Sequence, residues 1–432
     1  MKITILKGDI IYHESPAKLT AIANGYVIAE KGIVKGVYSA LPSEYADVSQ
    51  NSDIDFLDYT GKLIIPGMTD LHVHAPQYTF RGIGMDQELL TWLDQYTFPE
   101  EAKYSDLSYA KRAYRYFTED LRRGFTTRAV IFATLHKEAT IELMDQLEDT
   151  GLITYAGKVN MDRNSNPELQ EESPNASITA TKEWISEIAG KYKRTAPILT
   201  PRFIPSCSNE LMKQLGRLSK DTGLRIQSHL SENQSEIAWV RELVPQADCY
   251  ANAYEIFDAI GSEKLPAVMA HCVYSDKREM EILKNHGTFI AHCPSSNMNL
   301  TSGIAPVRKF LDAGIPVGLG TDVAAGSSMN MLQTILLTIQ ASKMYYRLVD
   351  QSVKPLTFEE AFYLATEGGG SYFGKVGSFK EGYEFDALVL DDSTMYSMRP
   401  FTLRERMERA CYNDADVRIL AKYVRGTQVY QK

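Results

Sequence analysis

Residues 66–80 read PGMTDLHVHAPQYTF, follow an apolar lead-in at residues 63–65, and hold two histidines, His72 and His74. In a β-strand, side chains alternate between the two faces, so these imidazoles point the same way. Two imidazoles at the end of one strand can bind a single metal ion, and imidazole is a common ligand of zinc and iron. Taken alone, the motif could equally be a chance pair on a solvated strand face.

Downstream of this first strand, seven short apolar runs alternate with segments of helical periodicity. Residues 104–123, for example, place Leu107, Ala110, Tyr114 and Leu121 on one face and end at Gly124. Strand–helix alternation predicts parallel pairing, and eight units over roughly 300 residues favour an α/β fold with a (β/α)8 barrel. The seven further runs are 126–135, 152–161, 197–205, 224–230, 265–274, 288–294 and 315–321.

The two ends of the chain have a different texture. Residues 1–60 contain short β-like runs punctuated by glycine, and similar runs return at 385–390 and 417–430. This pattern predicts a small β-sheet domain, of which the two end segments can be halves.

Composition limits the class of protein. The chain has 432 residues, 44% of them hydrophobic, which suits one large barrel with a smaller companion domain. A net charge of −9 without a basic tract argues against nucleic-acid binding. Five scattered cysteines without a Cys-x-x-Cys pair favour a reduced, cytoplasmic protein and exclude a thiolate zinc site. No apolar run approaches the ~20 residues of a membrane helix, and the N-terminus alternates like a strand rather than a signal peptide.

Polar residues gather where the predicted strands end, which is where the active site lies in a barrel of this kind. Scattered polar residues would fall as often at strand starts and on outer helix faces. The set consists of His72 and His74 on the first strand, Arg202 and Phe203 on the fourth, His229 and then Glu232 on the fifth, His271 on the sixth, His292 on the seventh and Asp322 on the eighth.

Several of these residues also have an ordinary structural explanation. His229 and His292 can be histidines of the core. Asp322 can cap a following helix, and Glu232 can be a first-turn carboxylate favoured by the helix dipole. The other histidines stand apart, and we expect His13 to lie at the surface.

The joint pattern points to metal chemistry. His72 and His74 together with His229 and Asp322 form a nitrogen and oxygen ligand set that leaves room for a water molecule. A metal ion lowers the pKa of such a water and makes it a nucleophile. Glu232 can then shuttle protons, and His271 with Asp322 can accept the proton of the water.

The order of these motifs resembles the amidohydrolase superfamily over nearly the whole chain. The resemblance implies a barrel at residues 66–376, inserted into a small β-sandwich formed by residues 1–65 and 377–432. Five longer stretches are similar to the guanine deaminase family: HAPQYTFRG at 74–82, LLTWLDQYTFPEE at 89–101, GKVNMDRN at 157–164, TPRFIPSCS at 200–208 and SHLSEN at 228–233.

This resemblance implies specific roles. One zinc ion per subunit, with Fe²⁺ as the other candidate, is expected on His72, His74, His229 and Asp322. Glu232 corresponds to the proton-shuttling glutamate and His271 to the histidine that helps to activate water. The reaction implied is hydrolysis of the amino group of guanine to xanthine and ammonia. Separately, the size and acidic charge of the predicted barrel lead us to expect a homodimer. Substrate contacts are expected from His74, Gln77, Arg202, Phe203, His229, Glu232 and Asp322.

The chemistry of three of these residues suits a purine. Arg202 can donate to the carbonyl oxygen of guanine, Gln77 offers a donor and an acceptor, and Phe203 can stack on the ring. Their ordinary alternatives are a surface ion pair, a loop hydrogen bond and a core residue.

Other functions remain open. A related deaminase or chlorohydrolase could act on another amino-purine, a pterin or a triazine, and a non-catalytic relative is a further alternative. The cysteine-ligated zinc deaminases are excluded because they require Cys-x-x-Cys. Lys158, at the end of the third strand, leaves a two-metal site open. Trp92, Tyr96 and Phe98 are expected in a pocket lid or a dimer contact.

Overall fold

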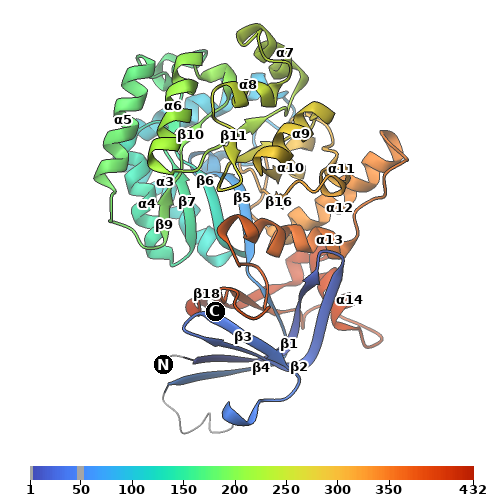
Figure 1. The fold of residues 1–432 in the computed structure, drawn as a ribbon. Helices are drawn as coiled ribbons and strands as arrows, with labels where there is room; N and C mark the ends of the chain where they lie inside the picture. Colours follow the sequence, from blue (N-terminus) through green and yellow to red (C-terminus); the bar gives the residue numbers. More distant parts are fainter. Residues whose placement is uncertain (1–2, 46–52) are drawn as a thin grey trace.

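The structure is a computed structural model that describes residues 3–45 and 53–432. The first two residues of the predicted N-terminal strand and residues 46–52 of the predicted first segment lie outside the described residues. Figure 1 shows a large part built of strands and helices, and below it a sheet that contains both ends of the chain.

Each of the eight predicted runs contains strand structure, and the two four-stranded sheets pair in parallel as predicted, whereas β13, in the run 265–274, pairs antiparallel with β12. β5, β6, β7 and β9 form one four-stranded sheet, and β11, β14, β15 and β16 form a second. β8 and β10 pair with each other. The bounds are β5 Met68–His74, β6 Thr126–Phe132, β7 Ile153–Gly157, β8 Val159–Asn160, β9 Thr195–Pro197, β10 Thr200–Pro201, β11 Gln227–Leu230, β12 Gly261–Ser262, β13 Leu265–Pro266, β14 Val268–His271, β15 Phe289–His292 and β16 Val317–Leu319.

Backbone hydrogen bonds link the two four-stranded sheets at both of their edges. On one side, the amide of Gln227 donates to the carbonyl oxygen of Leu199 at 3.0 Å. On the other, the amide of Asp322 donates to the carbonyl oxygen of His72 at 2.8 Å, and that of His74 donates to Val323 at 3.1 Å. The end of the last strand therefore lies beside the end of the first.

The strands are buried on both faces, as expected for parallel strands covered by helices. All seven residues of β5 and all seven of β6 are buried. One apolar cluster draws side chains from both sheets, among them Leu71, Val130, Ile198, Ala270 and Ala291. This cluster lies between the two sheets and holds them together.

Helices follow most of the strands. The predicted helix at 104–123 is observed as α3 (Leu107–Arg123), and the side chain of Asp106 caps it by accepting from the amide of Ser108. Leu107 was expected on the buried face but is 41% exposed, because it lies in the first turn. The remaining helices are α1 Leu89–Trp92, α2 Phe98–Ala102, α4 Lys137–Thr150, α5 Pro174–Glu187, α6 Asn209–Thr222, α7 Gln234–Leu243, α8 Tyr250–Ile256, α9 Lys277–His286, α10 Pro294–Asn299, α11 Val307–Asp312, α12 Met331–Leu348, α13 Phe358–Tyr363 and α14 Leu403–Tyr412.

Among residues 3–45 and 53–432, none of the helices combines the length and the apolar content needed to cross a membrane.

Both ends of the chain contribute to one seven-stranded sheet with the order β19-β18-β17-β4-β1-β2-β3. β4 joins the two ends, because it pairs in parallel with β1 and antiparallel with β17. A division of these strands into the two layers of a sandwich stays a prediction. The bounds are β1 Ile3–Ser15, β2 Lys18–Glu30, β3 Ile33–Tyr38, β4 Ile54–Pro66, β17 Ala387–Asp391, β18 Arg418–Val424 and β19 Thr427–Gln431.

His13 lies in β1 and was expected at the surface, but the structure buries it completely. Its Nε2 lies 2.8 Å from the carbonyl oxygen of Glu359, and its ring packs against Phe362. The surface expectation is wrong because α13 covers this strand.

Candidate metal centre and active site

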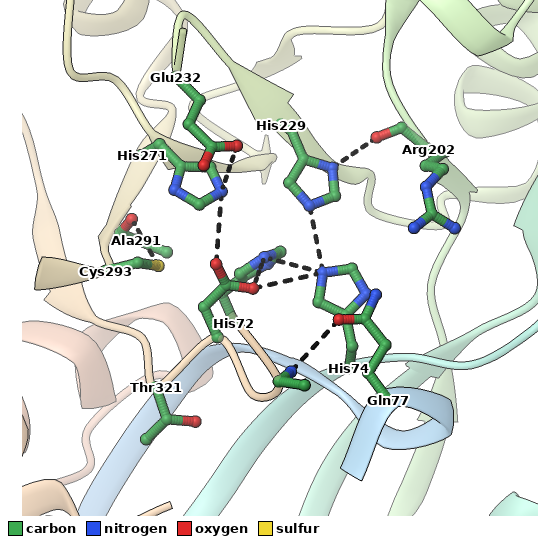
Figure 2. Close-up of polar contacts among 12 residues, drawn as sticks. His72, His74, Gln77, Arg202, His229, Glu232, His271, Ala291, Cys293 and Thr321 are labelled. Carbon is green, nitrogen blue, oxygen red and sulfur yellow. Dashed lines mark hydrogen bonds and ion pairs between the residues drawn. The ribbon is translucent and has the colours of Figure 1, made fainter. Parts of the chain in front are cut away.

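Four side chains predicted as metal ligands converge at the ends of β5, β11 and β16. Asp322 Oδ1 lies 3.1 Å from His72 Nε2 and 3.4 Å from His74 Nε2. The Nε2 atom of His74 lies 3.2 Å from that of His72 and 3.2 Å from that of His229. Figure 2 shows the three imidazoles directed at one point.

This spacing suits a bound metal ion. A tetrahedral ion with bonds of about 2.0–2.1 Å to nitrogen keeps its ligand atoms about 3.3 Å apart. Facing imidazole nitrogens at 3.2 Å repel each other unless a proton or a cation lies between them. The residues therefore fit a metal ion, and His72 belongs to two of the potential metal-binding groups, one with His74 and Asp322 and one with His229 and His271.

Hydrogen bonds orient the rings of His229 and His271. His229 Nδ1 lies 2.6 Å from the carbonyl oxygen of Arg202, to which it can only donate. His271 Nδ1 lies 2.9 Å from Oδ1 of Asn297. A proton on Nδ1 leaves Nε2 with a free lone pair, so both rings present an acceptor to the centre.

The backbone at three strand ends is strained. His271 and Asp322 have φ angles of +75° and +49°, and Ser231, just after β11, has +46°. Side chains other than glycine rarely adopt this left-handed region, and such residues cluster at active sites. Here the strain turns His271 and Asp322 towards the same centre.

Glu232 lies beside this centre without joining it. Its Oε2 is 3.3 Å from His271 Nε2, and Ser302 donates to its Oε1 at 3.2 Å. Burial and the charge of Asp322 raise the pKa of Glu232 to about 8. A carboxyl group with a pKa near neutrality can both accept and release a proton.

Burial acts on the other ionisable groups as well. It lowers the pKa of His74 and of His229 well below the usual value, with further lowering by the nearby His72. Burial also lowers the pKa of His271. Burial alone would raise the pKa of Asp322, but His72 and its neighbours outweigh it and hold this pKa far below the usual range. Neutral imidazoles and an ionised carboxylate are the forms that bind metals.

A pocket opens onto the centre. The empty space in and above it, open solvent included, is about 400 Å³. Polar groups and apolar side chains share its wall: His74, Gln77, Leu89, Trp92, Leu93, Arg202, Phe203, His229, Glu232, Glu236, His271, Leu300, Asp322 and Ala325.

Comparison with known proteins agrees with this geometry. Residues 63–428 match the amidohydrolase family. The chain belongs to the amidohydrolase family.

Individual members of this family are similar over the full length. A guanine deaminase of Dictyostelium discoideum is 37% identical over 99% of this chain and 98% of its own. The crystal structure of a guanine deaminase from C. acetobutylicum with guanine bound in the active site is 44% identical, with a TM-score of 0.94 over 99% of this chain and 100% of that one. An E. coli guanine deaminase structure is 30% identical, with a TM-score of 0.86 over the whole of both chains.

In this amidohydrolase, the ordinary alternatives for two carboxylates do not hold. Asp322 caps no helix with its side chain, because α12 begins at Met331 and has Asn330 as its N-cap. Glu232 precedes α7, whose N-cap is Asn233, and its carboxylate faces His271 instead of the helix. Arg202 is not in a surface ion pair, since its side chain is 3% exposed and lies 2.6 Å from Glu101.

Gln77 and Phe203 also line the pocket of this amidohydrolase. Gln77 donates from Nε2 to Glu101 at 2.8 Å and accepts at Oε1 from the amide of Ala324 at 3.2 Å. Phe203 is 6% exposed and directly follows Arg202. All the predicted substrate contacts thus border one cavity.

His292 and Lys158 lie apart from this pocket wall. Within the described part of the chain, neither ring nitrogen of His292 has a hydrogen-bond partner, and burial with the nearby His271 lowers its pKa to about 3. Lys158 Nζ donates to Glu171 at 2.5 Å and to the carbonyl oxygen of Val159. This ion pair gives Lys158 a partner outside the metal centre.

Sequence reasoning missed four residues of the site. Asn297 contacts His271, Ser302 contacts Glu232, and Glu236 accepts from the amide of Glu232 at 2.7 Å. Glu101 contacts both Gln77 and Arg202. Two of them had a local signal: Glu101 ends the stretch 89–101 that resembles the family, and Glu236 follows Glu232 by four residues.

Proposed function

We propose that this protein is a guanine deaminase, a hydrolase of C–N bonds that converts guanine and water to xanthine and ammonia. The observation that carries the proposal is the full-length similarity to the C. acetobutylicum enzyme with bound guanine, at 44% identity. The pocket supports it, because purine-recognising groups border the candidate metal centre.

We propose one zinc ion per subunit, held by His72, His74, His229 and Asp322, with Fe²⁺ as the second candidate. The chemistry that the metal supplies when bound is a water molecule acidic enough to act as a nucleophile at neutral pH. The nitrogen and oxygen ligands favour these metals over those that prefer oxygen alone.

Proton transfer falls to Glu232 and His271. The carboxylate of Glu232 takes a proton from the attacking water and delivers it to the ring nitrogen beside the amino-bearing carbon. His271 Nε2, 3.3 Å from Glu232 and 3.7 Å from Asp322 Oδ2, supports this transfer together with Asp322. The amino group leaves as ammonia once it has received the second proton of the water, and the water oxygen becomes the new carbonyl oxygen of xanthine.

Substrate recognition falls to the residues opposite the metal ligands. The guanidinium of Arg202 donates to the carbonyl oxygen of guanine. Gln77 pairs with a purine edge, and Phe203 stacks on the ring. His74, His229, Glu232 and Asp322 contact the reacting end of the purine.

Guanine turnover tests the proposal. Metal-loaded protein is mixed with guanine and the conversion to xanthine is followed by ultraviolet absorbance, with and without a chelator. We expect conversion that stops when the metal is removed and resumes when zinc returns. No conversion by metal-loaded protein, together with turnover of another amino-purine, pterin or triazine, would assign the enzyme to that substrate.

The proposal extends to the arrangement of the two parts of the chain. We infer that the two four-stranded sheets form a closed (β/α)8 barrel over residues 66–376, which the hydrogen bonds of Gln227 and Asp322 across both edges support. Residues 1–65 and 377–432 would form the companion β-sandwich, which the pairing of β4 with β17 supports.

We further propose that the enzyme acts in the cytoplasm as a homodimer. All five cysteines are free, as expected in a reducing compartment. Met344, Leu348 and Val349 expose apolar side chains near the end of α12, with exposed fractions of 48%, 68% and 61%. Light scattering during size-exclusion chromatography would contradict the dimer if it gave the mass of one chain.

A further inference from the structure

The segment 89–102 supplies no group to the proposed reaction, yet it forms one wall of the pocket. Leu89, Trp92 and Leu93 line the pocket. Further along, the ring of Phe98 lies 5.2 Å from the guanidinium carbon of Arg202. In the same short helix, α2, Glu101 is 2% exposed.

The carboxylate of Glu101 contacts both polar side chains proposed to recognise the purine. Its Oε2 accepts from Nη1 of Arg202 at 2.6 Å, and its Oε1 accepts from Nη2 at 3.2 Å. Oε1 also accepts from Nε2 of Gln77 at 2.8 Å. The carboxylate of Glu101, in the segment 89–102, therefore contacts one side chain just after β10 and another in the turn after β5.

These contacts determine how Arg202 presents its donors. A guanidinium has five N–H groups in a fixed plane, and the forked pair with Glu101 uses one from each terminal nitrogen. The remaining N–H groups then point in directions set by that plane. Glu101 also balances the charge of Arg202, so that a buried cation can face a neutral ligand.

The same carboxylate determines which end of the Gln77 amide faces which way. An ionised carboxylate only accepts hydrogen bonds, so it selects the NH₂ end of Gln77. The backbone amide of Ala324 can only donate, so it selects the Oε1 end of Gln77, which lies 3.2 Å away. One N–H and one lone pair of Gln77 remain for a ligand, and their places cannot exchange while Glu101 is charged.

A second buried ion pair shows what a purely structural pair looks like in this chain. Arg128 Nε lies 2.7 Å from Asp386 Oδ2, and both side chains are at most 1% exposed. This pair joins β6 to the segment before β17, and neither residue borders the pocket. By contrast, Arg202 and Gln77, the two residues that Glu101 contacts, both border the pocket.

We propose that Glu101 is a positioning residue that sets the recognition of the purine carbonyl group by holding Arg202 and Gln77 in one orientation. This inference rests on the proposed function, and it gives the inserted segment 89–102 a part in substrate selection.

Binding of two purines that are not deaminated tests the inference without requiring turnover. Hypoxanthine carries the carbonyl oxygen at the position found in guanine, and unsubstituted purine lacks it. Titration calorimetry on metal-loaded protein gives both dissociation constants and hence their ratio. The variants are Glu101→Gln, which keeps the size and removes the charge, and Glu101→Asp, which keeps the charge.

Two matched controls accompany them. Glu100→Gln makes the same chemical change one residue away, where the carboxylate contacts Lys103 at 2.5 Å and does not border the pocket. Asp386→Asn breaks the structural pair with Arg128 and reports what a general loss of stability does to binding.

For Glu101→Gln we expect hypoxanthine binding to weaken about tenfold or more and purine binding to weaken less than about threefold, since charge-assisted bonds to the carbonyl oxygen are lost. The KM for guanine should rise in parallel while kcat changes less, and the metal content should stay at one per chain. Glu101→Asp should retain part of the hypoxanthine preference. Glu100→Gln and Asp386→Asn should leave the ratio of the two constants as in the wild type.

Equal weakening of both ligands by Glu101→Gln, or an unchanged ratio in a folded variant, would overturn the inference. If Glu101→Gln does not fold, Glu101→Asp decides the matter. Its shorter side chain should shift Arg202, so a ratio equal to that of the wild type would overturn the inference. Guanine turnover by the wild type is measured separately, so that failure of the proposed function is recognised independently of Glu101.

Discussion

Among single residues, Glu232 and Glu236 are two carboxyl groups with different environments, both inside the molecule. Both border the pocket, but the carboxylate of Glu232 faces His271, whereas that of Glu236 accepts from the amide of Glu232. Burial raises the pKa of each to about 8. The first is placed to exchange protons with a ligand, and the second supports the chain that carries the first.

Replacing Glu232 by glutamine separates proton transfer from metal binding. Glutamine keeps the shape and the contact with Ser302 but cannot carry a proton between water and ring. We expect kcat to fall about 10²–10⁴-fold, the usual contribution of general acid–base catalysis. Metal analysis should still find one ion per chain. Loss of the metal would instead make Glu232 a ligand.

The Glu236→Gln variant should change how stability depends on pH. The pKa of Glu236 is about 8 in the folded protein and near its usual value of 4.5 when unfolded. The folded state therefore binds more protons between these values, and stability falls as the pH rises through this window. The variant lacks this loss, so its free energy of unfolding should exceed that of the wild type by up to a few kcal/mol at pH 8 and not at pH 4.

Urea unfolding at a series of pH values measures this difference. Parallel pH profiles for the two proteins would show that Glu236 does not titrate in this window. The glutamine oxygen can still accept the amide of Glu232, so the local backbone is expected to be preserved.

Among the elements, β7 closely approaches the segment that leads from β9 into β10, at Gly157. A Cβ atom built there would collide with Oγ1 of Thr200 and with the carbonyl oxygen of Ile198. Only glycine lets the two segments approach this closely, and the contact lies just before Lys158, at the carboxyl end of β7.

Gly157→Ala should therefore destabilise the protein. The added methyl group meets backbone atoms that cannot move away, and overpacking of this kind costs about 1–3 kcal/mol. Thermal unfolding measures the loss. Gly124→Ala serves as the control, because the nearest atom to its added methyl group is a carbonyl oxygen at 3.2 Å. Equal melting temperatures for Gly157→Ala and the wild type would contradict the close approach.

Sequence patterns predicted the helices and strands better than the contacts that these elements make with one another. The helical spacing of 104–123 predicted α3, because the buried face of an amphipathic helix is visible in the local sequence. The exposure of Leu107 was not visible, since it depends on what covers the first turn. β8 and β10 are two residues each, too short for any period to show.

Across the whole molecule, the candidate metal centre joins segments that are far apart in sequence. His72 and His74 come from β5, His229 from β11 and Asp322 from the end of β16. Because the two four-stranded sheets both contribute, an ion bound there would connect them at the pocket end.

Removal of the metal should lower the melting temperature as well as the activity. A ligand that binds only the folded state at 1,000 times its dissociation constant stabilises that state by about 4 kcal/mol. We expect a decrease of several degrees in scanning calorimetry after chelation, reversed by zinc. Glu232→Gln is the control, since it should show the same decrease although it is inactive. A melting temperature independent of metal would contradict a shared site.

The sequence by itself determined the alternation of strands and helices, the candidate metal ligands and the residues proposed to contact the purine. Local periodicity and motif spacing carry that information. Tertiary structure alone decided that Glu101 meets both Arg202 and Gln77, that Asn297 supports His271, and that β4 pairs with β17. Those contacts join residues with no shared local pattern, and only the packing of sheets and helices brings them within hydrogen-bonding distance.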